Sequence, residues 1–357
     1  MIVETLSLEN WRNVRAAQVE FDPGLTLFTG PNAQGKTNLL EAVFLLATGR
    51  SHRTSRPEEL VSFEGDHAYL RARIRRPSGG YQLTARIDGG RVTRQREGKL
   101  FRRGQDPLGD FAAVLFAPED LLALKGAPAD RRRLLDLDVG QASLSYRQAH
   151  VRYGQVLRQR NALLRTYERP PRELLATWDS AWAQAAVALT RERQKLVERL
   201  APHFSARYGE ISGVDPASLE YEPSLKASDS AHALELLAER REDELRRRTS
   251  LLGPHRDDFK AGVDGRDLRL YGSQGEQRTV LVAFKLAAVS LLGEGSDGPP
   301  VLLLDDVLSE LDQDRRRNLL LAATGTQTIV TTTESALAGM QPGMTYAVRD
   351  GEYVRTW

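Results

Sequence analysis

The sequence feature that most constrains the fold is the octapeptide at residues 30–37, GPNAQGKT. It matches the phosphate-binding pattern G-x-x-x-x-G-K-[ST] at every fixed position. Residues 25–29 before it are predicted to form a strand after the turn at 22–24, and residues 38–47 after it a largely buried helix. A glycine-rich loop between a strand and a helix directs backbone N–H groups and the helix N-terminus toward one point, which suits a phosphate. The alternative is a glycine turn that matches by chance, and the flanking strand and helix favour the phosphate site.

The loop predicts a nucleotide site that uses ATP and Mg²⁺. Lys36 is expected to reach the β- and γ-phosphates and to act in catalysis, and the Thr37 hydroxyl is expected to be a Mg²⁺ ligand. The predicted nucleotide-binding residues are Gly30, Pro31, Asn32, Ala33, Gln34, Gly35, Lys36, Thr37 and Asn38.

A partner carboxylate for this loop occurs late in the chain. Residues 301–304 are four apolar residues that run into Asp305 and Asp306, after a Gly-Pro-Pro break at 298–300. Such a run is typical of a parallel strand buried on both faces, and ligands bind at the carboxyl ends of such strands. We therefore expect Asp305 to be a Mg²⁺ ligand and Asp306 to be a catalytic residue that polarises the attacking water. The alternative is a strand that ends in an ordinary turn, and the phosphate-binding loop favours the site.

The spacing of the two motifs predicts an inserted domain. Lys36 and Asp305 lie 269 positions apart, far more than in GTPase-like or kinase-like P-loop proteins. A length of 357 residues also favours two domains. We predict an α/β P-loop head in two halves, residues 1–117 and 250–357, split by a helical domain at 118–249.

Composition excludes several other functions. The chain has no cysteine, which excludes disulfides, thiolate metal sites and cysteine catalysis, and its six histidines are scattered, so no structural metal is expected. No run approaches the 18 apolar residues of a membrane span, and the first residues lack a secretion-signal pattern. The expected location is the cytoplasm, without membrane attachment.

Positive charge is concentrated in one segment. Residues 65–104 hold eleven Lys or Arg against three acids, a net charge of +8, whereas the whole chain carries +2. Strands are predicted at 67–76, 80–88 and 91–96, with Arg71, Arg73 and Arg75 alternating with apolar residues. One face then packs and the other presents guanidinium groups, either to a DNA backbone or simply to solvent. The candidate DNA-binding residues are Arg71, Arg73, Arg75, Arg94 and Arg96.

Other segments follow from periodicity. Residues 2–8 and 16–21 are predicted to form a hairpin, with a loop at 8–13. Long helical stretches at 143–167, 175–200 and 230–249 predict two antiparallel helices in a short, coiled-coil-like arm, although a plain helical domain fits the same pattern.

The chain then returns to the head. Short strands are predicted near 259–263 and 267–271, before an apolar helix that begins after Ser273 and continues to residue 292. Ser273 and Gly275 at this helix N-terminus predict a second anion-binding end.

These residues carry a family resemblance. The segment Ser273, Gln274, Gly275, Glu276 and Gln277 resembles the ABC signature motif, in the form found in SMC-like DNA-repair ATPases. Ser309, Glu310, Leu311 and Asp312 resemble the D-loop that follows the Walker B acids. The chain is similar to the RecF family of bacterial recombination mediators along most of its length, in stretches at 8–13, 49–53, 116–121, 125–128, 131–133 and 253–258.

The resemblance implies an ABC-type head split by a helical arm, with ATP held between two subunits of a homodimer. One subunit gives the P-loop and Walker B strand, and the other gives the signature motif through Ser273 and the helix end at Gly275. It also implies binding to double-stranded DNA at junctions with single strands or at gaps, weak DNA-dependent ATP hydrolysis that acts as a switch, and cooperation with RecR and RecO to load the recombinase.

The chain departs from transporter ATPases in three places. The signature has Gln274 where transporters have glycine, and Asp306 stands where they have glutamate, a shorter reach that fits slow turnover. No histidine follows residues 328–333, so Thr332 or Thr333 is the candidate for the switch position. Two other hypotheses are a transporter nucleotide-binding subunit and an SMC-like head that bridges DNA. The transporter hypothesis is disfavoured by the 237 positions between Lys36 and Ser273 and by the arginine-rich strands. The short arm disfavours the SMC-like hypothesis.

Overall fold

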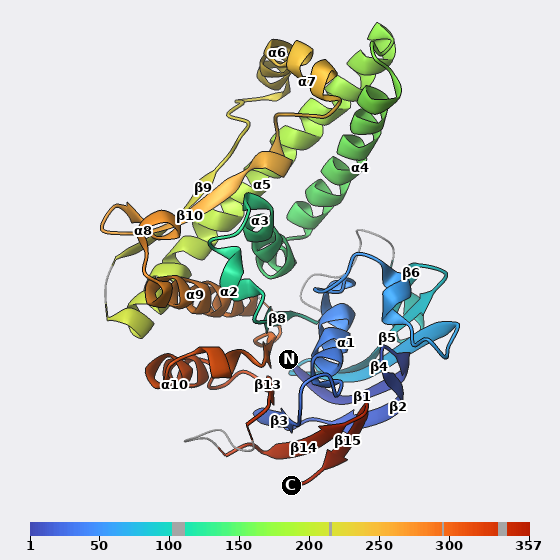
Figure 1. Cartoon of the computed structure of the whole chain (residues 1–357), viewed down its shortest axis with the longest axis vertical. Coiled ribbons are helices and arrows are strands. Elements are labelled where there is room, and N and C mark those ends of the chain that lie inside the picture. The colour runs from blue at the N-terminus through green and yellow to red at the C-terminus, as the bar shows by residue number, and fades with distance from the viewer. Residues whose placement is uncertain (102–110, 214–215, 295, 335–340) are drawn as a thin grey trace.

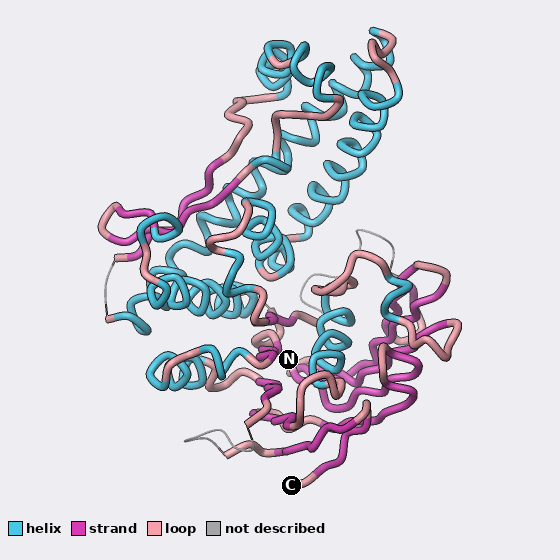
Figure 2. Tube along the Cα trace, viewed as in Figure 1, coloured by secondary structure: helices cyan, strands magenta, loops and turns pink. Residues whose placement is uncertain are grey.

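The computed structural model describes residues 1–101, 111–213, 216–294, 296–334 and 341–357. Helices and strands separate into two parts, a strand-rich head and an arm of long helices that projects from it (Figures 1 and 2). Arg102 and Arg103, which contribute to the basic segment, lie outside the described residues. Among the described helices, none is long and apolar enough to cross a membrane.

The central sheet of the head collects strands from distant parts of the chain. Its order is β15-β14-β3-β13-β12-β8, and every pair except β14–β15 is parallel. The strands are β3 (Leu25–Thr29), β8 (Ala113–Phe116), β12 (Val301–Asp305), β13 (Thr328–Thr332), β14 (Met344–Arg349) and β15 (Glu352–Arg355). The chain between β8 and β12 contains both the arm and helix α9 of the head, so the central sheet is completed only after the inserted segment.

Strand β12 is buried on both faces, as its apolar run predicts. Leu302 and Leu304 belong to the core around helix α9 (Gln274–Gly293), whereas Val301 and Leu303 belong to the core around helix α1 (Lys36–Thr48). Successive side chains of a strand point to opposite faces, so the apolar run supplies both cores at once. This burial fixes Asp305 at the strand's carboxyl end, beside the start of α1.

A second, antiparallel sheet covers the other side of α1. It runs β2-β1-β4-β5-β6-β7 and consists of β1 (Ile2–Trp11), β2 (Val14–Glu20), β4 (His67–Arg76), β5 (Gly79–Asp88), β6 (Arg91–Arg96) and β7 (Lys99–Leu100). Leu70, Ala72 and Ile74 pack inward, and the arginines between them face outward. The prediction of a loop from residue 8 is wrong for residues 8–11, because buried Leu8 and Trp11 continue β1.

The arm is built on an antiparallel helix pair. Helix α4 (Leu144–Thr166) turns back into α5 (Arg172–Ser212), and the lower half of α5 lies along α9 (Figure 1). The smaller elements of this region are α2 (Asp120–Ala123), α3 (Pro128–Leu137), η2 (Val139–Ala142), α6 (Ser230–Glu239) and α7 (Arg241–Arg247). The prediction of two antiparallel helices is confirmed, and the fold class is the ABC-type α/β head with an antiparallel β subdomain and an inserted helical domain.

A buried ion network fixes the helices of the arm to one another. Arg160 of α4 is fully buried and donates to Asp179 of α5 at 2.9 Å and to Glu244 of α7 at 2.6 Å. It also donates to Ser250 at 2.6 Å. Because a buried charge without its partners is strongly destabilising, this network specifies how the three helices meet.

A three-stranded sheet joins the arm to the C-terminal part of the chain. Its order is β11-β10-β9, with β9 (Ala217–Glu222), β10 (Asp258–Val263) and β11 (Arg266–Asp267), and η3 (Pro254–Arg256) precedes β10. The strand predicted at 267–271 is wrong, since residues Leu268–Tyr271 form the short helix α8. The Asp267 side chain accepts the Arg269 N–H at 2.9 Å and so starts that helix.

Candidate nucleotide-binding site

The phosphate-binding loop has a backbone that only glycine allows at two points. Gly30 has φ +153° and Gly35 has φ +109°, both in a region that favours glycine. A Cβ atom at Gly30 would lie 2.4 Å from the carbonyl oxygen of Val348 in β14. The loop therefore packs against β14 at Gly30 and continues directly into the N-terminus of α1.

Lys36, the first residue of α1, folds back over the loop. Its Nζ donates to the carbonyl oxygens of Gly30 at 2.7 Å and Pro31 at 2.8 Å. Burial lowers the pKa of Lys36, while Asp306 and Asp305 act in the opposite direction. The ammonium group thus binds the loop's own carbonyl oxygens, and it can exchange them for phosphate oxygens of a bound nucleotide.

Thr37 and Asp305 meet at the start of α1. Thr37 Oγ1 donates to Asp305 Oδ1 at 2.9 Å, across 268 positions of sequence. Burial raises the pKa of Asp305, and hydrogen bonds from Thr331 and Thr37 oppose that shift. A hydroxyl and a carboxylate beside a phosphate loop are the hard oxygen donors that Mg²⁺ prefers, so these residues fit the ion.

Asp306 is held in an unusual conformation next to this pair. Its φ is +50°, and its N–H donates to the carbonyl oxygen of Thr331 at 3.1 Å. Its Oδ1 is buried and has no hydrogen-bond partner among the described residues. A buried carboxylate oxygen without a partner is costly and is found at sites that bind a further group.

The C-terminal hairpin of β14 and β15 contacts the phosphate-binding loop through hydrogen bonds to Gln34 and Gly35. Asp350 N–H donates to Gln34 Oε1 at 2.8 Å, and Gly351 N–H donates to the Gln34 carbonyl oxygen at 2.9 Å. Tyr353 of β15 donates its hydroxyl to the Gly35 carbonyl oxygen at 3.0 Å. Residues 350–353 could not be predicted to hold the loop, because nothing in their local pattern indicates which loop they contact.

A second set of polar contacts surrounds the outer side of α1. Arg12 donates to both oxygens of the buried Glu41 at 3.0 and 2.8 Å, and Ser51 donates to Glu41 at 2.5 Å. Arg53 donates to Asn38 Oδ1 at 2.8 Å. These contacts bring residue 12 and the polar segment 51–53 to the first two turns of the helix that begins in the phosphate loop.

The signature segment forms a capped helix end, as its sequence predicts. Ser273 Oγ accepts the Glu276 N–H at 3.2 Å, and Glu276 returns the bond by accepting the Ser273 N–H at 2.7 Å, a capping box. Gln277 donates to the Gly272 carbonyl oxygen at 3.0 Å. Within the described residues, no hydrogen bond or ion pair joins 273–277 to 30–38 of the same chain.

The predicted D-loop lies directly after the two acids. It begins in η4 (Val307–Glu310), where Ser309 Oγ donates to the Asp306 carbonyl oxygen at 2.8 Å. Asp312 accepts the Arg315 N–H at 2.9 Å and caps α10 (Gln313–Ala322). Arg315 also donates to Thr279 of α9 at 2.8 Å, so the segment after the acids is joined to the signature helix.

Comparison with known proteins identifies the family. Residues 5–105 match the model of the AAA domain family. The DNA replication and repair protein RecF of Symbiobacterium thermophilum is 41% identical over 350 residues, which cover 94% of this chain and 92% of the relative. The RecF of Limosilactobacillus fermentum is 40% identical over 93% of this chain and 92% of its own. The chain belongs to the RecF family.

Solved structures agree with this RecF assignment. The recombination mediator protein RecF of the RecFOR pathway, solved as RecF-ATPrS, matches with a TM-score of 0.90 at 30% identity, covering 100% of this chain and 98% of its own. The Smc head bound to the winged-helix domain of ScpA matches with a TM-score of 0.54 at 18% identity, over 100% of this chain and 98% of its own. The second match shows a shared fold.

The five arginines predicted to contact DNA do not share one face of the antiparallel sheet. Arg71, Arg73 and Arg75 lie on the outer face of β4, where Glu4 binds Arg73 at 3.1 Å and Arg75 at 2.7 Å. The register pairs Arg94 and Arg96 with inward-facing residues of β5, so they point to the opposite face.

These two inward arginines contact the head itself. Arg94 Nη1 donates to the carbonyl oxygens of Leu46 at 2.9 Å and Ala47 at 3.0 Å, at the C-terminus of α1. The guanidinium of Arg96 lies 4.2 Å from the centre of the Tyr81 ring. A cation at the carbonyl end of a helix is stabilising, so Arg94 contributes to the stability of the head. DNA binding by the five arginines stays a prediction, and the outer three are its better-exposed candidates.

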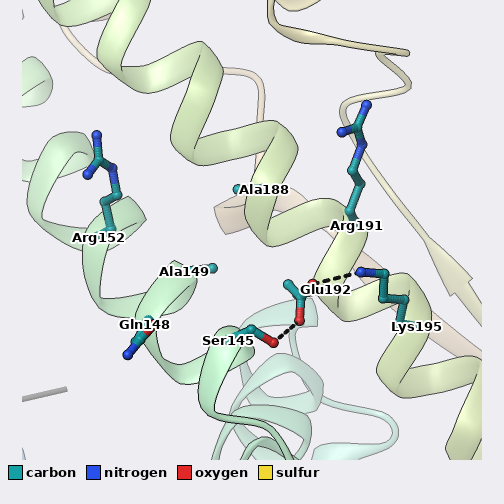
Figure 3. A pocket seen from close by; sticks show the side chains of 8 residues that line it. All are labelled: Ser145, Gln148, Ala149, Arg152, Ala188, Arg191, Glu192 and Lys195. Atoms are coloured by element: carbon teal, nitrogen blue, oxygen red, sulfur yellow. Dashed lines mark hydrogen bonds and ion pairs between the residues drawn. The ribbon is translucent and has the colours of Figure 1, made fainter. Parts of the chain in front are cut away.

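A separate hollow of about 550 Å³ lies in the arm between α4 and α5, and no P-loop residue lines it (Figure 3). Ala149 and Ala188 line it, and Arg152 and Arg191 extend from facing helices. Glu192 closes one end by accepting from Lys195 at 3.0 Å and from Ser145. The hollow is therefore distinct from the nucleotide site.

Proposed function

We propose that this RecF-family chain binds ATP with Mg²⁺ at residues 30–38 and Asp305, and uses it to control binding to DNA in recombinational repair. The observation that carries the proposal is the 2.9 Å contact between Thr37 and Asp305, which joins the two motifs of an ATPase across the inserted arm. The solved relatives named for their ATP and ATPrS complexes support the choice of nucleotide.

Different residues of the chain bind the phosphates, hold the metal and orient the attacking water. The loop N–H groups and Lys36 bind the β- and γ-phosphates, while Thr37 and Asp305 hold the metal. Bound Mg²⁺ would neutralise charge on the phosphate oxygens. Asp306, with one buried oxygen free of partners among the described residues, orients the attacking water. Its short side chain fits hydrolysis that resets a switch slowly.

ATP would act between two copies of the chain. Within the described residues, the signature helix end at Ser273 and Gly275 makes no hydrogen bond or ion pair with the phosphate loop of its own chain, which supports use by a partner copy. Exposed Leu270 and Tyr271 lie directly before it, with 71% and 72% of their surfaces accessible. A γ-phosphate at this helix end adds charge-assisted contacts that ADP lacks, so ATP favours the dimer.

DNA would contact the outer face of β4. Arg71, Arg73 and Arg75 form a row there, and Glu4 forms ion pairs with the last two. The expected ligand is double-stranded DNA at gaps or junctions with single strands, with RecR and RecO as protein partners in the cytoplasm. These assignments extend the repair role that the names of the RecF relatives carry.

The test of the nucleotide site uses Lys36→Met and Thr37→Val. The first removes the charge aimed at the phosphates and the second removes a metal ligand, so ATP affinity is expected to fall about tenfold or more with the fold intact. Titration with a fluorescent ATP analogue measures affinity, and circular dichroism checks folding. Wild-type ATP affinity in both variants would refute the nucleotide site. If ATP affinity falls but DNA binding in the presence of ATP is unchanged, the proposed control of DNA binding by ATP is refuted.

A further inference from the structure

The strand between the two nucleotide motifs carries a threonine that contacts both acids. β13 lies between the phosphate-loop strand β3 and the acid strand β12. Its register places Thr331 beside Asp305 on one side and beside Phe28 on the other. A side chain at this end of the central strand is therefore enclosed between the loop and the acids, and Thr331 is fully buried.

The Thr331 hydroxyl makes two contacts at once. Oγ1 donates to Asp305 Oδ1 at 2.7 Å and accepts the Asp306 N–H at 3.1 Å. A hydroxyl has one proton and two lone pairs, so it can satisfy both groups together. The carbonyl oxygen of Leu304, at 3.5 Å, is the weaker acceptor for the same proton.

Each contact restrains one feature of the metal site. The bond to Asp305 fixes the same carboxylate oxygen that Thr37 approaches at 2.9 Å. The bond to the Asp306 N–H, together with the Thr331 carbonyl oxygen, holds the peptide that carries Asp306 at φ +50°. A backbone in this region persists only where its surroundings hold it there.

The next two threonines of the chain lack these contacts. Thr332 is buried, but its hydroxyl accepts the Glu334 N–H at 3.1 Å. Thr333 follows the end of the strand and is exposed. The alternation of a strand accounts for Thr332, because neighbouring residues point to opposite faces, whereas Thr333 lies beyond the end of β13.

We propose that Thr331 is the positioning residue of the metal site, which orients the Asp305 carboxylate and the Asp306 peptide for Mg²⁺ and water. This inference rests on the proposed nucleotide function and deepens it, since it moves the switch position from Thr332 or Thr333 to Thr331. Groups that orient metal ligands typically change metal affinity 10- to 100-fold when they are removed.

The test measures how strongly Mg²⁺ enhances nucleotide binding. Thr331→Val has nearly the same shape but no hydroxyl, and Thr331→Ser keeps the hydroxyl. Thr328→Val is a matched control at the far end of β13, where the hydroxyl donates to the Thr326 carbonyl oxygen. A fluorescent ATP analogue is titrated in Mg²⁺ and in EDTA. Thr331→Val is expected to lose at least about tenfold of the Mg²⁺-dependent affinity and none of the affinity in EDTA.

Thr331→Ser and Thr328→Val are expected to behave as wild type. If the valine variant does not fold, Thr331→Ala and Thr331→Ser form a second pair that differs only in the hydroxyl. Equal Mg²⁺ enhancement in the two members of the folded pair would overturn the proposal for Thr331. Lys36→Met is measured in parallel to test the nucleotide site itself. Wild-type ATP affinity in Lys36→Met would overturn both the nucleotide site and the role of Thr331. If Lys36→Met binds ATP more weakly, the nucleotide site stands, and the comparison of the two Thr331 variants decides the role of Thr331.

Discussion

His52 is a buried titratable side chain that packs against α1, the helix that begins in the phosphate-binding loop. It lies edge-on to Phe44 of α1, with ring centres 5.9 Å apart, and neither ring nitrogen has a hydrogen-bond partner among the described residues. Burial lowers its pKa to about 4, against the opposing effect of Glu41. Its neutral form is therefore the one that the fold accommodates.

This shift predicts a pH-dependent stability. Between pH 6.5 and 4 the unfolded chain binds a proton at His52 that the folded chain does not, so the free energy of unfolding falls as the pH falls. The loss attributable to His52 is about 2 kcal/mol between pH 7 and pH 5. His52→Phe should remove this contribution, as measured by urea unfolding at the two pH values.

The comparison has to be made between variants, because other groups titrate in the same range. Burial raises the pKa of Asp138 to about 6, which acts in the opposite direction on stability. His67→Phe, at the half-exposed start of β4, is the control. An equal pH dependence in wild type and His52→Phe would show that His52 titrates normally in the folded protein.

At the scale of elements, the antiparallel sheet uses its two faces differently. The inner face of β4 packs on α1, and Arg94 of β6 binds the carbonyl end of the same helix, while the outer face carries Arg71, Arg73 and Arg75. The sheet thus supports the helix that begins in the phosphate loop and presents charge to solvent. DNA bound outside and nucleotide bound inside would be separated by one sheet and one helix.

The outer face should contribute to the salt dependence of DNA binding. Each phosphate contact contributes a slope of about −0.9 in log K against log salt, so replacing Arg71, Arg73 and Arg75 by alanine should flatten the slope by up to roughly 2.7. Glu4→Gln removes the competing carboxylate and should strengthen binding. Fluorescence anisotropy with a gapped duplex measures both.

A matched control lies on the arm, where Arg246, Arg247 and Arg248 are three exposed arginines at the end of α7. Replacing them removes the same charge from a different surface. If both triple variants lower the slope equally, net charge rather than the β4 face determines binding.

At the scale of the whole molecule, the phosphate loop and the signature motif belong to different layers of the head. The loop precedes α1 on one face of the central sheet, and the signature begins α9 on the other face. Arg315 links the segment after the acids to α9, so the two layers are connected within one head. In the proposed dimer, each head would offer both surfaces to its partner, and a pair of heads would complete two sites.

Two variants test this arrangement. Asp306→Asn is expected to bind ATP, to hydrolyse it at least about tenfold more slowly, and to accumulate as a dimer, because the water loses its orienting group while the phosphate contacts remain. Ser273→Arg is expected to bind ATP and stay monomeric. Sedimentation with ATP and with ADP measures the outcome. Equal dimer formation by the wild type in both nucleotides, or normal dimerisation of Ser273→Arg, would contradict the arrangement.

The sequence by itself determined the parts of this protein that depend on contiguous residues. The phosphate loop, the buried strand before Asp305, the bounds of β4 and β6 and the capped helix at Ser273 all follow from local patterns of glycine, apolar and capping residues. Each is governed by backbone geometry or by one buried face, and both are visible within about ten neighbouring positions.

Only the tertiary structure decided which distant residues meet. Sheet register turned Arg94 and Arg96 inward, away from the outer arginines, and the placement of β13 in the centre brought Thr331 to the acids. The hairpin at 350–353 reaches the phosphate loop through contacts more than 300 positions apart in sequence. Such contacts depend on strand order and on which face each residue occupies, and a shift of one residue in register would exchange the faces.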